Sequence, residues 1–212
     1  MKEVGVAGAR PPSFFTVTYV EVVPPLAAQA ESVLTAYREA SRFDAGLASF
    51  DLMHRLDRPN QFTLLCGWSN QEAFDTHAIG SHATRLNRDL QAIIAAPNDT
   101  RQHTGLAVGG ARTSGRGGIT AVTHVDVIPA HKDGGMAALA QLAEDSRKHR
   151  GNLRFEVWQQ TNRPNHFTLV ETWSSREAFD SHAMAAETRD FRIQLAAMTG
   201  ALYDERLYRA VP

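Results

Sequence analysis

Cysteine is almost absent from this sequence, since Cys66 is the only one among 212 residues. A single cysteine excludes an internal disulfide and fits a reducing compartment, so we expect a cytoplasmic protein. No apolar run approaches the roughly 18 residues of a membrane-spanning helix. The first 13 residues contain a lysine and an arginine but no continuous apolar stretch, which argues against a secretory signal. We therefore expect a soluble chain without a membrane partner.

An excess of either charge is also missing. Lys and Arg number 22 against 23 Asp and Glu, which gives a net charge near −1, and the basic residues are spread along the chain. Domains that bind nucleic acid usually carry a basic patch, so we expect no nucleic-acid partner. The histidines do not show the spacing of metal ligands, and we expect no metal site.

One stretch of the sequence occurs twice. It runs from Arg58 to Ala78 and again from Arg163 to Ala183, an offset of 105 residues, and 14 of its 21 positions are identical. Unrelated sequences would share about one or two positions over this length. The chain therefore consists of two related units.

The repeated stretch predicts a turn, a strand and a helix. Arg-Pro-Asn is typical of a turn, and the Phe-Thr-Leu-Leu or Phe-Thr-Leu-Val run that follows favours a strand. Ser69 and Ser174 then stand three residues before Glu72 and Glu177. This is the spacing of a capping box, so we predict that the two serines are helix N-caps.

The rest of the chain completes the same order of elements in both units. For the first unit the patterns predict strands over 14–23, 48–56, 62–68 and 100–107, and helices over 26–41, 70–79 and 81–95. The second unit repeats this order from Thr120, with its last strand predicted over 201–210. Residues 1–13 are interpreted as a tail, and residues 108–118, with five glycines in eleven positions, as a flexible linker. The units are then 14–107 and 119–212.

Each unit has the order β-α-β-β-α-β of a ferredoxin-like α+β fold. Such a unit leaves one face of its antiparallel sheet bare, and the alternation of the first strand puts Val17, Tyr19 and Val23 on that face. Apolar residues there need cover, so we predict that the units pack sheet to sheet as an intrachain pseudo-dimeric α+β barrel. Tyr19, Glu21, His124 and Asp126 are assigned to this interface. Whether two such chains form a further homodimer is left open.

Three features together resemble the antibiotic biosynthesis monooxygenase family. They are a strand followed by proline (Val22-Val23-Pro24, Val127-Ile128-Pro129), a Ser-Arg pair followed by glycine (Ser41-Arg42…Gly46, Ser146-Arg147…Gly151) and the run from Phe167 to His182. The resemblance extends over nearly the whole chain, twice. It implies ferredoxin-like units paired as a dimeric α+β barrel, in a family that includes quinol and polyketide-quinone oxygenases, haem-degrading relatives and members without a known activity.

The oxygenases of this family work without flavin or metal, so the resemblance implies no cofactor. The first hypothesis is a cofactor-independent monooxygenase that acts on a quinol or a related phenolic or polyketide aromatic, with molecular oxygen as co-substrate. The second is a non-catalytic or stress-related module that binds a small hydrophobic or haem-like ligand. The tryptophan and histidine of the haem-degrading relatives fall on His77 and Asn87 and on His182 and Arg192, which weakens the haem version. A different small-molecule enzyme or a purely structural role completes the alternatives.

The resemblance also implies a pocket between each sheet and its own helices. The candidate catalytic residues there are Trp68, His77, Trp173 and His182, and the candidate substrate-binding residues are Leu64, His82, Leu169 and Glu171. Neutral imidazole can accept a proton near neutral pH, which suits the histidines to the task. The alternative is that these aromatic rings only fill the core.

The two copies depart from the family pattern in different ways. The acidic residue two places before the tryptophan is present as Glu171 but is Cys66 in the first unit. The helix pattern His-x-x-x-Ser-His is complete at His77, Ser81 and His82 but becomes His182, Ala186 and Glu187 in the second unit. An asparagine that some antibiotic-making members carry is Leu64 or Leu169 here. We expect unequal halves and favour the second, whose match to the family is more continuous.

Overall fold

The computed structural model describes residues 11–109 and 118–212, so the first ten residues of the predicted tail and most of the predicted linker lie outside the described residues. The first unit contains β1 (Phe14–Glu21), α1 (Ala27–Ser41), β2 (Leu47–Arg55), β3 (Gln61–Trp68), α2 (Gln71–Ala78), α3 (Ser81–Leu90) and β4 (Asp99–Ala107). The second contains β5 (Ile119–Asp126), α4 (Lys132–Ser146), β6 (Asn152–Gln160), β7 (His166–Trp173), α5 (Arg176–Ala183), α6 (Ala186–Ala196) and β8 (Asp204–Ala210). A short 3-10 turn that begins at Pro24 or Pro129 precedes α1 and α4.

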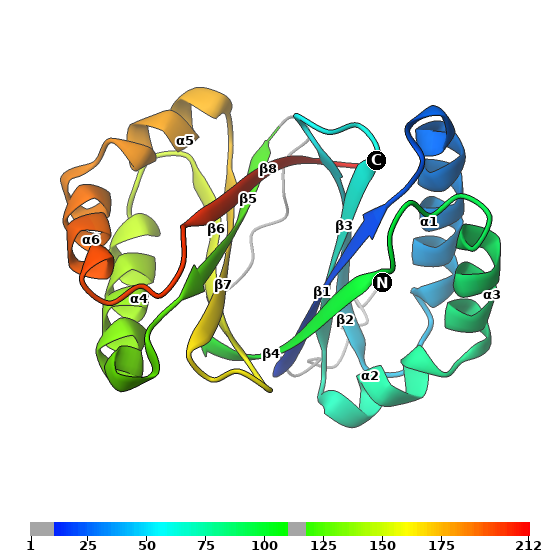
Figure 1. Ribbon diagram of the computed structural model, residues 1–212, viewed down its shortest axis with the longest axis horizontal. Coiled ribbons are helices and arrows are strands. Elements are labelled where there is room, and N and C mark those ends of the chain that lie inside the picture. The colour runs from blue at the N-terminus through cyan, green and yellow to red at the C-terminus, as the bar shows by residue number, and fades with distance from the viewer. Residues whose placement is uncertain (1–10, 110–117) are drawn as a thin grey trace, which may run out of the picture.

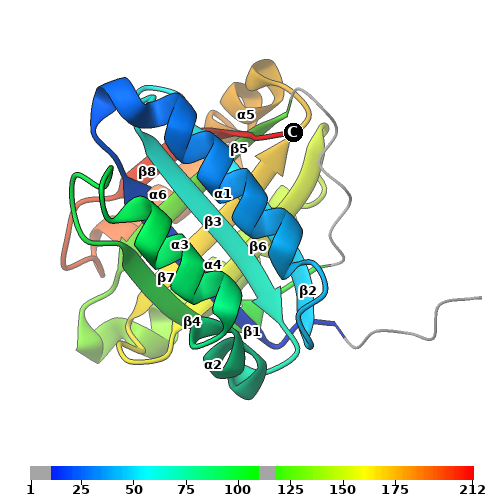
Figure 2. The same cartoon turned by 90° about the vertical axis from the view of Figure 1, so that its right-hand side faces the viewer.

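The strands form a closed barrel in the order β1-β3-β2-β8-β5-β7-β6-β4. The last strand of each unit closes it, because β4 pairs with β1 and with β6 of the other unit, while β8 pairs with β5 and with β2. Figure 1 shows the helices on the two outer sides of the molecule with the strands between them. In Figure 2, α1 and α3 lie across the outer face of the first unit's sheet. The predicted pseudo-dimeric α+β barrel is confirmed.

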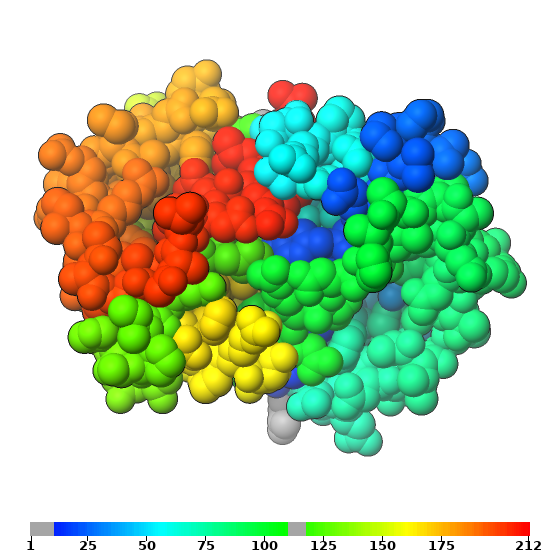
Figure 3. All heavy atoms as spheres, viewed as in Figure 1, coloured from blue at the N-terminus to red at the C-terminus, as the bar shows by residue number. Residues whose placement is uncertain are grey.

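The barrel interior is the core shared by the two units. It contains Phe15, Val17, Met53, Leu65, Val122, Trp158, Val170 and Tyr208, with Tyr19 packed against them. Trp158 is fully buried and stacks on Phe15 with a centroid separation of 4.6 Å. The Tyr19 hydroxyl lies 2.5 Å from His124 Nε2 across the boundary between the units. In Figure 3 the C-terminal strand lies against the first unit, so side chains of both units meet along the middle of the molecule.

Two further cores fill the space between each sheet and its own helices. Because neighbouring residues of a strand point to opposite faces, the residues between the interior positions point to the helices. The first of these cores contains Leu34, Leu64 and Trp68, and the second contains Leu139, Leu169 and Trp173. The strand-end tryptophans therefore lie on the helix side of the barrel wall.

Two glycines allow each helix to pass close to the chain that precedes β2 or β6. Gly46 and Gly151 have positive φ angles of 82° and 84°. A Cβ atom at Gly46 would lie 2.5 Å from the Ala73 Cβ, and one at Gly151 would lie 2.7 Å from the Ala178 Cβ. The glycine of the Ser-Arg…Gly pattern is thus required both by backbone conformation and by space.

Several predicted boundaries are wrong for identifiable reasons. The N-caps are Asn70 and Ser175, which accept hydrogen bonds from Ala73 N and Ala178 N, whereas the N–H groups of Ser69 and Ser174 donate to Gly46 O and Gly151 O. β1 ends at Glu21, and Val23 is 40% exposed instead of facing the other sheet. Helix α3 ends at Leu90 because residues 94–95 bond to the end of β1. β8 begins at 204, after an unpaired segment, instead of at 201.

We predict that the shared interior core dominates stability. Trp158→Ala should lower the free energy of unfolding by about 3–5 kcal/mol, because it removes a fully buried indole that contacts both units. Phe43→Ala, at a side chain that is 91% exposed, is the control and should change it by about 0.5 kcal/mol or less. Urea denaturation checks both, and equal effects would contradict this view of the barrel.

Candidate active site

The fold brings each predicted tryptophan into contact with its predicted histidine. The tryptophan ends β3 or β7, and the helix that follows turns back over it. The ring centroids are 4.6 Å apart for Trp68 and His77 and 4.5 Å apart for Trp173 and His182, whose rings stack at 21°. All four side chains are buried, with the histidines 7% and 5% exposed. Both candidate pairs therefore exist, under the helical cover.

In the first unit, both ring nitrogens of His77 have close partners. Its Nδ1 lies 2.6 Å from Asp44 Oδ2, and its Nε2 lies 2.5 Å from the Tyr37 hydroxyl. A carboxylate accepts only, so Nδ1 donates to Asp44 and Nε2 is left to accept from Tyr37. The Asp44 carboxylate also approaches His82 Nε2 at 3.5 Å. His77 is held from both sides and has no free nitrogen.

Burial keeps the Tyr37 hydroxyl and the Cys66 thiol of the first unit protonated. It raises the pKa of the Tyr37 hydroxyl, which therefore remains a donor to His77. It also raises the pKa of the Cys66 thiol, so the thiolate that a nucleophilic cysteine needs is disfavoured. The Trp68 indole N–H donates away from this group, to Thr16 Oγ1 at 3.1 Å.

In the second unit, the histidine and the tryptophan converge on a buried carboxyl group. Glu171 Oε2 accepts a hydrogen bond of 2.7 Å from the Trp173 indole N–H and lies 3.5 Å from His182 Nε2. The other ring nitrogen of His182 lies 3.0 Å from His149 Nδ1 and 3.3 Å from Thr188 Oγ1. Glu171 is only 2% exposed.

Desolvation decides the protonation of this pair. Burial raises the pKa of Glu171 to about 8, with the neighbouring Glu205 contributing in the same direction and the Trp173 bond opposing it. Burial also lowers the pKa of His182 to about 4, helped by His149 and Arg192. Although the two groups are close enough for an ion pair, burial favours the neutral form of both near neutral pH. The site is therefore a neutral carboxyl beside a neutral imidazole.

A comparison of equivalent positions shows an exchange of acid and base between the copies. Asp44 corresponds to His149, and His82 corresponds to Glu187, each at the offset of 105 residues. In the first unit the acid precedes β2 and the histidine lies on α3. In the second unit the histidine precedes β6 and the acid lies on α6, and His149 Nε2 is 3.7 Å from Glu187. The second unit has therefore not lost a histidine, because its acid and histidine have exchanged positions.

The residue that contacts Nε2 of the site histidine also differs between the units. In the first unit it is Tyr37 on α1, whose equivalent in the second unit is Leu142. In the second unit it is Glu171 on β7, whose equivalent in the first unit is Cys66. The site residues predicted from the sequence do not include Tyr37, Asp44, His149 and Thr188. A position-by-position comparison of the repeats would have identified the exchange, because Asp44 and His149 stand two residues before the repeated glycine.

The remaining predicted residues are located as follows. Leu64 and Leu169 are buried in the core of their own unit, and His82 is partly exposed beside Asp44. Three clefts that described residues line, of about 520, 300 and 150 Å³, lie elsewhere and are not lined by either tryptophan–histidine pair. The apolar pocket that the resemblance implies is thus not among these clefts.

Two broader features concern only the described residues, 11–109 and 118–212. No group of three or more His, Cys, Asp or Glu side chains there is arranged to hold a metal ion. No helix in these ranges is both long and apolar enough to cross a bilayer.

Fold and site together define a two-unit α+β barrel with a buried tryptophan–histidine site under the helices of each half. The chain belongs to the antibiotic biosynthesis monooxygenase family, whose model matches residues 13–88 and again 118–193. Both copies of the repeated stretch lie within these matches.

Solved structures share the complete two-unit arrangement. A candidate monooxygenase of Fusobacterium nucleatum has a TM-score of 0.84 at 12% identity over 96% of this chain and 94% of its own. One of Lactobacillus acidophilus has a TM-score of 0.77 at 14% identity over 94% of each chain. An anthrone oxidase-like protein has a TM-score of 0.73 at 15% identity over 97% of this chain and 94% of its own. At these identities the likeness concerns the fold. No curated protein matches the sequence.

We predict a pH-dependent effect of Glu171→Gln on stability. Between the ordinary value of 4.5 and about 8, folded Glu171 holds a proton that the unfolded chain releases, so its contribution to stability falls as pH rises. Glutamine removes this dependence. Relative to the wild type, the variant should therefore gain on the order of 2–4 kcal/mol between pH 5 and pH 8, measured by urea denaturation. The opposite dependence of His182 is common to both proteins and cancels in the difference.

Glu187→Gln is the matched control, because this side chain is about half exposed and loses little hydration on folding. A constant difference between Glu171→Gln and the wild type across this pH range would show that Glu171 is ionised in the folded protein.

Proposed function

We propose that the second unit is a monooxygenase site for a quinol or a related phenolic aromatic, which it oxidises without flavin or metal. The observation that carries this proposal is the buried Glu171 carboxyl, held between Trp173 and His182 with a pKa of about 8. Membership of the family supports the reaction class. The phenolic substrate is our inference from the chemistry of this carboxyl group.

Glu171 suits the removal of a phenolic proton better than His182 does. An ordinary phenol has a pKa of about 10, and a base works best when its own pKa is near that of the acid and near the working pH. His182, with a pKa of about 4, is a weak base, whereas ionised Glu171 is a comparatively strong one. The Trp173 indole N–H donates a hydrogen bond to Glu171 and so stabilises its carboxylate in the absence of substrate. In this role His182 is a neutral neighbour that orients the proton acceptor.

Deprotonation makes the ring electron-rich enough to react with molecular oxygen. In the balanced reaction a hydroquinone and one O₂ become a hydroxyquinone and one water. One oxygen atom is inserted into a ring C–H bond to form the new hydroxyl group, and the other leaves as water with the two hydrogen atoms that the hydroquinone hydroxyls lose on oxidation to the quinone. The substrate supplies all four electrons, so no separate reductant is consumed. The dry surroundings of Trp173 and Phe155 would protect the reactive intermediate from hydrolysis.

The first unit is less suited to this chemistry. Both nitrogens of His77 are occupied, one of them by the phenol of Tyr37, and the strand carries Cys66 where the second unit has Glu171. A substrate phenol would have to displace Tyr37 to reach Nε2. We therefore assign turnover to the second unit and a supporting role in the barrel to the first.

Entry of the substrate requires part of the cover to move, because Trp173, His182 and Glu171 are 0%, 5% and 2% exposed. Helix α5 has only 8 residues and is separated from α6 by two residues, so displacement of α5 is the simplest opening. Local openings of short, lightly anchored elements cost less than global unfolding. The same opening would serve a module that binds a hydrophobic ligand without converting it.

Oxygen consumption on a panel of hydroquinones tests the proposal. For a quinol on which the wild type is active, Glu171→Gln should reduce turnover by about 10²-fold or more, because it removes the proton acceptor. His182→Ala removes a residue that orients this acceptor and should reduce turnover by a smaller but clear factor. His77→Ala, its counterpart in the first unit, should leave most of it, provided that circular dichroism shows each variant folded. Equal losses from the two histidine variants would contradict the assignment to one unit. Saturable quinol binding without oxygen uptake would favour the binding module.

The pH profile provides an independent test. Because Glu171 must be ionised to accept a proton, kcat/KM should rise with pH and level off above about 8. Glu171→Gln should lose this limb of the profile along with most of the rate. A profile that levels off near pH 4, where His182 titrates, would assign the base to the histidine instead.

A further inference from the structure

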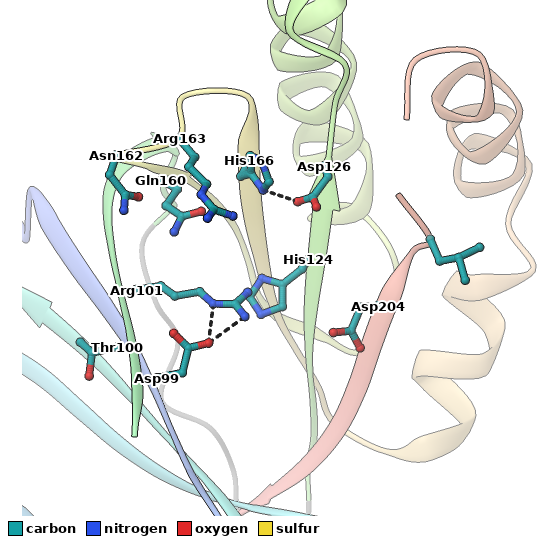
Figure 4. A pocket seen from close by; sticks show the side chains of 11 residues that line it. Asp99, Thr100, Arg101, His124, Asp126, Gln160, Asn162, Arg163, His166 and Asp204 are labelled. Atoms are coloured by element: carbon teal, nitrogen blue, oxygen red, sulfur yellow. Dashed lines mark hydrogen bonds and ion pairs between the residues drawn. The ribbon is translucent and has the colours of Figure 1, made fainter. Parts of the chain in front are cut away.

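The largest of the three clefts described above lies at one mouth of the barrel, and none of its lining residues belongs to a tryptophan–histidine pair. It has a volume of about 520 Å³ and is lined by residues of both units: β4 from the first, and β5, the β6–β7 hairpin and the start of β8 from the second. Figure 4 shows these side chains around the opening, with Arg163 reaching in from the hairpin turn and Arg101 from β4. Apart from Leu202, every lining residue is polar.

The charges around this cleft are paired, with one exception. Asp99 bonds to Arg101 at 2.8 Å, Asp204 to Arg206 at 2.6 Å, and Asp126 lies 2.6 Å from His166 Nδ1. Each carboxylate thus has its own cationic or hydrogen-bonding partner. Arg163 forms no ion pair with the described part of the chain. The group left to bind a ligand is therefore a guanidinium.

The equivalent positions of the first unit show what a closed version of this mouth looks like. At the offset of 105 residues, Arg55 is the equivalent of Gln160 and Asp57 is the equivalent of Asn162. Arg55 Nε donates to Asp57 Oδ1 at 2.7 Å and its Nη1 donates to Gln61 Oε1 at 2.7 Å, so that rim is closed by its own ion pair.

The recess on that side is only about 150 Å³. In the second unit both partners are neutral amides, and the cleft is more than three times larger. The difference between the copies, and not the presence of charge alone, marks the larger cleft as a site.

We propose that this cleft binds a small, hydrophilic carboxylate-bearing molecule. Arg163 would pair with the carboxylate, since the planar guanidinium matches two carboxylate oxygens, and the amides of Gln160 and Asn162 add neutral donors. The volume lies in the range of sites for small molecules. The cleft is separate from the aromatic site in place and in chemistry. Because both units line it, occupancy also stabilises the closed barrel.

Isothermal titration calorimetry of the full chain tests the proposal, with succinate and citrate as probes and succinamide as the uncharged match. We expect saturable one-to-one binding of at least one carboxylate and none of succinamide. Arg163→Gln, at an exposed turn position, should weaken binding by about tenfold or more. Its counterpart Arg58→Gln is the matched control and should leave the affinity unchanged.

A second variant keeps the test independent of Arg163. Gln160→Arg combined with Asn162→Asp rebuilds the ion pair of the first unit at the larger mouth, and it should abolish carboxylate binding while the chain stays folded by circular dichroism. The proposal is overturned if no carboxylate binds, if Arg58→Gln weakens binding as much as Arg163→Gln, or if inorganic phosphate binds while both carboxylates do not.

Discussion

The structure depends on one constraint: neither sheet can bury its inner face or pair its edges alone. A four-stranded sheet with helices on one side leaves an apolar surface and unpaired edge strands, both of which favour association. Here β4 and β8 each bond to a strand of the other unit, so the two sheets become one continuous ring. The closure puts Trp158 and Tyr208 in a common core and sends Trp68 and Trp173 outward under the helices. The location of the two tryptophan–histidine sites therefore follows from the pairing of the edge strands β4 and β8 with the other unit.

Inside each half, burial has more influence on the chemistry than charge pairing. Glu171 and His182 are close enough to attract one another as ions, yet removal of water favours the neutral form of both. Asp44 and His77 also form a close pair, but Asp44 is nearer the surface and His77 is fixed by a second bond from Tyr37. Two copies of the same strand–helix junction therefore provide different electrostatic environments. This difference is the physical basis for assigning different roles to them.

Much of the fold could be predicted because its signals are local and repeated. Alternation along Val17 and Tyr19 placed them correctly inside the barrel, and the repeat indicated which elements belong together. Val23 was misplaced because a strand pattern does not show where pairing stops, and here Pro24 begins a turn three residues after β1 ends. The N-cap was displaced by one residue because Ser69 has a bond of its own to make with Gly46. The contacts of Tyr37 and Asp44 with His77 join residues 40 and 33 positions apart, and periodicity carries no information on such contacts.

Tyr19 and His124 occupy equivalent positions in the two units and touch each other across the boundary, flanked by the equivalent arginines Arg101 and Arg206 at 5.4 and 5.0 Å from the Tyr19 ring. In an assembly of two identical chains, a residue near the twofold axis meets its own copy, so only self-complementary contacts can be formed there. Joining the copies in one polypeptide removes this requirement. A hydroxyl can then face an imidazole, a pairing that a symmetric homodimer cannot place at that point. Covalent linkage thus gives each half the freedom to diverge where symmetry would otherwise have forced it to match.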